Sequence, residues 1–119
     1  MKSKYGFYKV GTANFELSIG DIKGNTQNII KLIKEAIKEE VRILTFPELS
    51  LTSYTSQDLF YHFEFQEEIN SQLKEIAKNV SDNILVSVGG PLLYLDKVFS
   101  VSYVFFNHKL VGIVGKTFL

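Results

Sequence analysis

The chain has 119 residues, of which 45% are hydrophobic, and this is enough for one domain with a buried core. Its 13 basic and 13 acidic residues cancel and do not cluster by sign, which argues against a cationic surface for nucleic acid or anionic lipid. The lack of cysteine excludes disulfides and thiolate metal sites, and two isolated histidines, His62 and His108, do not form a zinc-binding spacing.

The N-terminal segment is polar and lacks the apolar centre of a signal peptide. No apolar run approaches the roughly 20 residues that cross a bilayer. We therefore expect a cytoplasmic protein with no membrane and no nucleic-acid partner. The first element is a strand over Tyr5 to Phe15, whose apolar residues occupy both faces as in a covered strand.

Two helices are predicted from apolar residues at helical spacing. Asn25 is the expected N-cap of the first, whose stripe comprises Ile29, Ile33, Ala36, Ile37 and, at its end, the polar Glu40. A short buried strand over Val41 to Phe46 follows. The second helix is expected to end at Ser81 to Asn83, and its apolar face comprises Phe65, Ile69, Leu73, Ile76, Ala77 and Val80.

Three further strands are predicted, over Ile84 to Val88, Val98 to Phe106 and Leu110 to Val114. The expected connections are Gly89-Gly90-Pro91 with a turn over Leu93 to Lys97, and then Asn107-His108-Lys109, which predicts antiparallel hairpins. The fold class is therefore α/β, with a mixed sheet and two amphipathic helices on one of its faces. The other face needs a cover, which is downstream sequence, another subunit or both. We expect a homo-oligomer.

Glu48 is the main candidate for catalysis. It follows the Val41 to Phe46 strand and is turned out of it by Pro47, which cannot continue a strand ladder. Open α/β sheets bind ligands at the carboxyl ends of their strands, and partial burial there raises a carboxyl pKa toward that of a general base. An acid in the first turn of a helix, or a salt-bridge partner, is an equally good interpretation of Glu48 taken alone.

Lys116 follows the last predicted strand and carries a charge suited to stabilising an oxyanion, although a lysine there is more commonly a solvated residue that protects a sheet edge. The surrounding GIVGKT resembles the end of a phosphate-binding loop, but such a loop requires glycine where this chain has Leu110. We therefore exclude a nucleotide site of that type. Tyr54 and Asp58 are candidates to line a pocket, or else turn and helix-cap residues.

Taken in order, Asn14, GDIKGN, a helix, VRILTFPELSLTSYT and NHKLVGIVGKTFL resemble the nitrilase superfamily of carbon–nitrogen hydrolases nearly from end to end. Within it, FPELSLTSYTSQDLF is most similar to the glutamine-hydrolysing domain of glutamine-dependent NAD synthetases. The resemblance implies that residues 1–119 are the N-terminal portion of a nitrilase-type α-β-β-α sandwich. The chain departs from the family pattern at Asn14, Ser100 and Gly115.

The resemblance also implies roles for single residues. Glu48 becomes the general base, Lys116 the stabiliser of the tetrahedral intermediate, and Tyr54 a pocket residue near the substrate glutamine. The third catalytic residue of the family is a cysteine that forms a thioester and releases ammonia, and this chain has none. In full-length relatives a separate domain uses the ammonia to amidate deamido-NAD, and ATP and magnesium belong there.

We therefore predict that this chain alone is inactive as a glutaminase. Two alternatives stay open from the sequence. One is a non-catalytic nitrilase-like scaffold or binding subunit, and the other is part of an amidase or nitrilase that acts on a different substrate.

Overall fold

The computed structural model describes residues 9–12, 22–46, 63–95 and 97–118. Its elements are β1 (Val10–Thr12), α1 (Ile22–Lys38), β2 (Ile43–Thr45), α2 (Phe63–Lys78), β3 (Leu85–Tyr94), β4 (Lys97–Phe106) and β5 (Lys109–Phe118). The strands form one sheet in the order β1-β2-β3-β4-β5. β1, β2 and β3 are parallel, whereas β3, β4 and β5 pair antiparallel. This is the α/β class and the hairpin pairing expected from the sequence.

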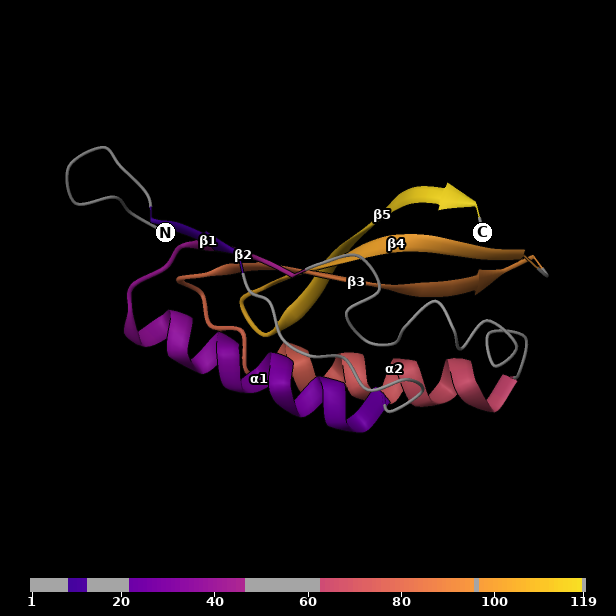
Figure 1. Ribbon diagram of the computed structural model, residues 1–119, viewed down its shortest axis with the longest axis horizontal. Helices are drawn as coiled ribbons and strands as arrows, with labels where there is room; N and C mark the ends of the chain where they lie inside the picture. Colours follow the sequence, from indigo (N-terminus) through magenta and orange to yellow (C-terminus); the bar gives the residue numbers. More distant parts are fainter. Residues whose placement is uncertain (1–8, 13–21, 47–62, 96, 119) are drawn as a thin grey trace.

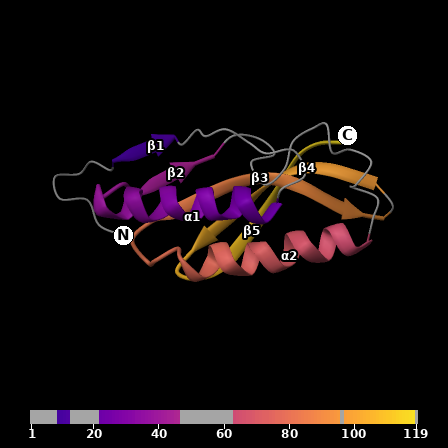
Figure 2. The ribbon, with the colours of Figure 1, turned by 60° about the horizontal axis from the view of Figure 1, so that its bottom comes forward.

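Both helices cover the same face of the sheet (Figure 1). They lie side by side along that face and contact each other (Figure 2). The core lies between helices and sheet because the apolar stripes of the helices face alternate residues of the strands. Its fully buried side chains include Ile29 and Ile33 of α1, Ile76 of α2, Val86 and Val88 of β3, and Phe105 of β4.

The opposite face carries the other alternate side chains of each strand. The register aligns Val10 with Ile43, Ile43 with Leu85, and Leu85 with Phe106, so these four residues form an apolar row across the sheet. Val10 is 64% exposed and the other three are half-buried. Both described helices lie on the other side of the sheet. The cover of this row by downstream sequence, another subunit or both stays a prediction.

α1 begins earlier than the sequence predicted, which corrects the assignment of Asn25 as an N-cap. The helix starts at Ile22, and Asn25 lies within it with no exposed surface. Ile37, expected on the apolar stripe, lies at its margin and is 37% exposed. The prediction failed because Gly24 and Asn25, which favour turns, are tolerated in a helix that packs against a sheet.

α1 ends in a Schellman motif. The Val41 amide donates to the Ala36 carbonyl at 3.0 Å and the Glu40 amide to the Ile37 carbonyl at 3.1 Å. Glu40 takes the left-handed conformation that glycine usually supplies at this position, with φ of 60°. Val41 and Ala36 are both buried in the core, and a hydrophobic contact between these two positions commonly accompanies a Schellman motif.

The predicted turn at Gly89-Gly90-Pro91 is wrong, because all three residues lie inside β3. They pair with Ser102, Val101 and Ser100 of β4. β2 pairs with β3 only at Leu85 to Ser87, so the part of β3 around Gly89-Gly90-Pro91 has β4 as its strand neighbour within the described ranges. Proline is tolerated at such an edge because its missing N–H removes no bond on the unpaired side. The two hairpin turns lie at Leu95 and at Asn107-His108, where φ is positive, within the expected turn over Leu93 to Lys97 and the expected Asn107-His108-Lys109 connection.

Candidate active site

The strand directions bring two of the candidate regions to the same end of the sheet. β2 runs parallel to β3, and two antiparallel steps, from β3 to β4 and from β4 to β5, restore that direction in β5. The carboxyl ends of β2 and β5 therefore point the same way. Ligands of open α/β sheets bind beyond the carboxyl ends of the strands.

β2 is an inner strand, and its pairing extends to the last described residue before the candidate base. The Phe46 amide donates to the Ser87 carbonyl at 2.9 Å, and the Phe46 side chain is buried. Glu48 follows two positions later in the sequence. Glu48, Tyr54 and Asp58 lie outside the described residues, as do Asn14 and His62, so their predicted roles stay predictions.

Lys116 lies within β5 and not after the strand, which corrects the sequence prediction. Gly115 pairs with Val101 and Thr117 with Ser100, so Lys116 is the extra residue of a β-bulge. A second bulge leaves Val111 without a counterpart in β4. Bulges are frequent beside active sites because they redirect a side chain and increase the local twist. β5 is longer than the predicted strand over Leu110 to Val114 and extends to Phe118.

The bulge lies beside small residues of the neighbouring strand. Ser100, one of the departures from the family pattern, is fully buried and pairs with both Pro91 and Thr117. A β-carbon built on Gly115, another departure, would meet no atom within 4 Å. Lack of space therefore does not explain the glycine next to Lys116.

Tyr103 is a buried polar residue that the sequence analysis did not single out. Its side chain is 1% exposed and its hydroxyl donates to the Pro91 carbonyl at 2.6 Å. Burial raises the pKa of Tyr103 above its usual value, while a hydrogen bond with the Gln66 side chain acts in the opposite direction. Tyr103 therefore connects α2, through Gln66, with β3 at the level of Ser100. Its alternation with the apolar Val101 and Phe105 predicts burial but not this hydrogen bond.

The described residues offer no site for a metal ion, since no three or more His, Asp or Glu side chains among them lie close enough to hold one. His108 lies in the β4–β5 turn, as expected from the sequence. In the described part of the chain, no helix is both long and apolar enough to cross a membrane.

Residues 9–116 match the carbon-nitrogen hydrolase family. The chain is 32% identical over 108 residues to the glutamine-dependent NAD(+) synthetase of Aquifex aeolicus, across 90% of this chain and 19% of that protein. The crystal structure of a glutamine-dependent NAD(+) synthetase from Cytophaga hutchinsonii superposes with a TM-score of 0.82 and 30% identity, across 91% of this chain and 18% of that one.

A variant of the amidase from Nesterenkonia sp. AN1, solved in complex with butyramide, has the same fold. It superposes with a TM-score of 0.77 at 16% identity, across 97% of this chain and 45% of the amidase. This chain covers a smaller part of the NAD(+) synthetases, about a fifth of their length.

Proposed function

Because this chain belongs to the carbon-nitrogen hydrolase family, we propose that it supplies two of the three catalytic residues of a glutamine-hydrolysing site in an NAD synthetase. Glu48 is the general base and Lys116 stabilises the oxyanion. The observation that supports this assignment is the shared direction of β2 and β5, with Lys116 at a bulge near the end of β5. The 32% identity to the Aquifex aeolicus synthetase supports the choice of substrate.

The reaction that we propose needs a cysteine from outside these 119 residues. Glu48 takes the thiol proton as the sulfur attacks the side-chain amide carbon of glutamine. The carbonyl oxygen becomes an oxyanion opposite the Lys116 ammonium. The carbon–nitrogen bond then breaks, the leaving nitrogen takes the proton from Glu48, and ammonia departs. Water, deprotonated by Glu48, hydrolyses the thioester to glutamate and restores the thiol.

Tyr54 is proposed as a pocket residue near the glutamine, and the ammonia is proposed to serve the amidation of deamido-NAD. ATP and magnesium belong to that second reaction, and we assign them no residue of this chain. We retain three further proposals. Residues 1–119 form the N-terminal portion of the hydrolase domain, the protein is a homo-oligomer, and its location is cytoplasmic.

A chimaera tests this proposal. The 119 residues replace the matching segment of the Cytophaga hutchinsonii synthetase, and NAD formation is measured with glutamine and, separately, with ammonia as the nitrogen source. We expect a folded chimaera to use both. A chimaera that uses ammonia but not glutamine would contradict the proposal, because the synthetase reaction would then be intact and the glutaminase site absent. Faster hydrolysis of simple aliphatic amides than of glutamine would instead favour an amidase.

A further inference from the structure

A groove between α2 and the beginning of β5 lies away from the candidate active site. Its volume is about 720 Å³. One wall is the C-terminal half of α2, and the other is the β4–β5 turn with the first residues of β5. The lining residues are Asn70, Leu73, Lys74, Ala77, Lys78, His108, Lys109 and Leu110.

Hydrogen bonds hold the two walls of the groove together. The Asn107 amide donates to the Ser81 carbonyl at 3.1 Å, and the His108 amide to the Val80 carbonyl at 2.6 Å. The His108 ring nitrogen Nδ1 also donates to the Lys78 carbonyl, at 3.0 Å, in the last turn of α2. The groove is therefore pre-organised, so this chain loses little conformational entropy when a partner binds.

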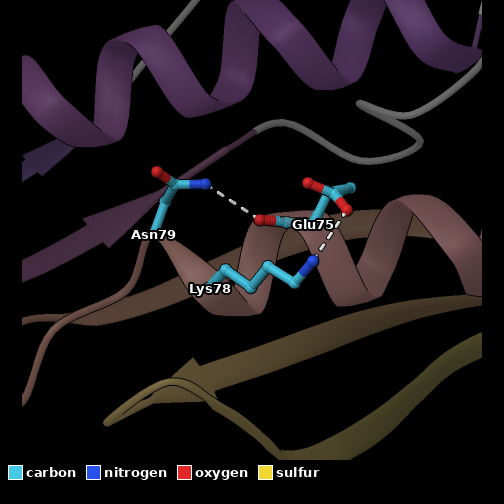
Figure 3. Close-up of polar contacts among 3 residues, drawn as sticks. All are labelled: Glu75, Lys78 and Asn79. Atoms are coloured by element: carbon cyan, nitrogen blue, oxygen red, sulfur yellow. Dashed lines mark hydrogen bonds and ion pairs between the residues drawn. The ribbon is translucent and has the colours of Figure 1, made fainter.

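The charge of the groove is positive. It is lined by Lys74, Lys78 and Lys109, and no carboxylate lines it. Lys78 pairs with Glu75 at 3.1 Å, on the same helix (Figure 3). Lys74 and Lys109 are exposed and make no ion pair within the part of the chain that the structure describes. An occupant of complementary charge is therefore acidic.

The surface between the lysines is apolar. Leu73 is nearly buried, Ala77 is half-buried, and Leu110 is 40% exposed. A smaller depression continues along α2, shares Asn70 and Lys74 with the groove, and is bordered by Glu67. The groove is thus open and elongated, with an apolar surface and charged edges. This shape suits a polypeptide segment better than a small molecule, which proteins usually enclose.

We propose that this groove docks an acidic segment of a partner protein. Carboxylates of the segment pair with Lys74 and Lys109, and an apolar side chain packs on Ala77 and Leu110. Lys109 and Lys116 are seven residues apart on β5, about 23 Å along an extended strand, so the groove is separate from the proposed catalytic site. The proposal does not depend on glutamine hydrolysis.

Fluorescence anisotropy with a labelled ten-residue peptide tests the proposal. The probe peptide alternates pairs of glutamate with pairs of leucine. One control peptide has lysine in place of glutamate, and another has serine in place of leucine. We expect the 119-residue chain to bind the probe at least tenfold more tightly than either control, and added salt to weaken the binding.

The variant Lys74→Gln/Lys109→Gln should weaken binding of the probe at least tenfold. Its matched control, Lys31→Gln/Lys34→Gln on the exposed side of α1, makes the same charge change and should weaken binding less than twofold. Circular dichroism checks that both variants are folded. Absence of binding, equal effects of the two double variants, or displacement of the probe by millimolar ATP or inorganic phosphate would each overturn the proposal, the last by indicating a small-anion site.

Discussion

The substitution Tyr103→Phe tests the buried hydrogen bond between Tyr103 of β4 and Pro91 of β3. It deletes one hydroxyl and leaves the aromatic ring, which is 1% exposed, in place. The Pro91 carbonyl then loses a donor that lies at 2.6 Å, and Pro91 is itself buried. Gln66 loses its hydrogen bond to the same hydroxyl.

The expected destabilisation follows from the buried Pro91 carbonyl, which is left without its donor. A hydrogen bond contributes about 0.5–1.5 kcal/mol net, whereas a buried acceptor without a partner costs about 1–3 kcal/mol. We therefore expect the free energy of unfolding to fall by about 2 kcal/mol. Tyr94 is 60% exposed, so Tyr94→Phe is the matched control and should change the free energy by less than about 0.5 kcal/mol.

The wild-type chain and the Tyr103→Phe variant should also differ in how their stability depends on pH. Burial raises the pKa of Tyr103 in the folded state above that of the unfolded chain, which is about 10. Above about pH 10 the folded state keeps a proton that the unfolded state has lost, so stability falls as pH rises. The contribution of the Tyr103 hydroxyl to stability is fully present below pH 10. Above pH 10 the free energy of unfolding of the wild-type chain should fall by up to about 1.4 kcal/mol per pH unit relative to that of Tyr103→Phe. The difference in stability between the two chains should therefore narrow.

Urea unfolding of both variants and the wild type, at pH 8 and at several values between pH 9.5 and 11, measures these quantities. Groups that two chains share cancel in the difference between their free energies of unfolding. A loss below about 0.5 kcal/mol for Tyr103→Phe at pH 8, or a gap that does not narrow above pH 10, would refute the reasoning about this hydroxyl.

Three other predictions follow from the described structure and the composition. Glu40→Gly should stabilise the protein by about 0.5–1 kcal/mol in the same urea assay, because glycine adopts a φ of 60° without steric cost; unchanged stability would contradict this. Ile33→Ala should destabilise it by about 2–5 kcal/mol, since Ile33 is fully buried between α1 and the sheet, and a loss below about 1 kcal/mol would show that the core closes over the cavity. The 119-residue chain alone, which lacks cysteine, should release no more ammonia from glutamine than its Glu48→Gln variant, and release above that level would show a different nucleophile.

The elements with regular apolar spacing were predicted well. Ile29 and Ile33 of α1 are buried as expected, as are Ile69, Leu73 and Ile76 of α2, because periodic burial leaves a direct mark on sequence. The antiparallel pairing of the last three strands was also predicted from their turns, and the resemblance to carbon–nitrogen hydrolases is confirmed over residues 9–116.

Errors occurred where a neighbouring element overrides a local preference. Gly89-Gly90-Pro91 has the composition of a turn but is held in β3 by its pairing with β4. α1 ends at a glutamate in a position that glycine usually occupies, so no residue marks its end.

Only part of the candidate site could be predicted from the sequence. Glu48 and Lys116 were selected from their motifs, but the bulge at Lys116 depends on how β5 aligns with β4, and such a register is set by the partner strand. The hydrogen bond of Tyr103 to Pro91 joins residues of adjacent strands and has no local signature.

The most direct test of the proposed function is the ratio of glutamine-driven to ammonia-driven NAD formation in the chimaera. Glu48→Gln and Lys116→Met should each lower this ratio at least 100-fold, in line with the contributions of about 10²–10⁴ for a general base and about 10²–10³ for an oxyanion partner. Glu35→Gln and Lys38→Met, exposed residues of α1, make the same changes and should leave the ratio within twofold. A ratio that either catalytic variant leaves unchanged would contradict the assignment of that residue.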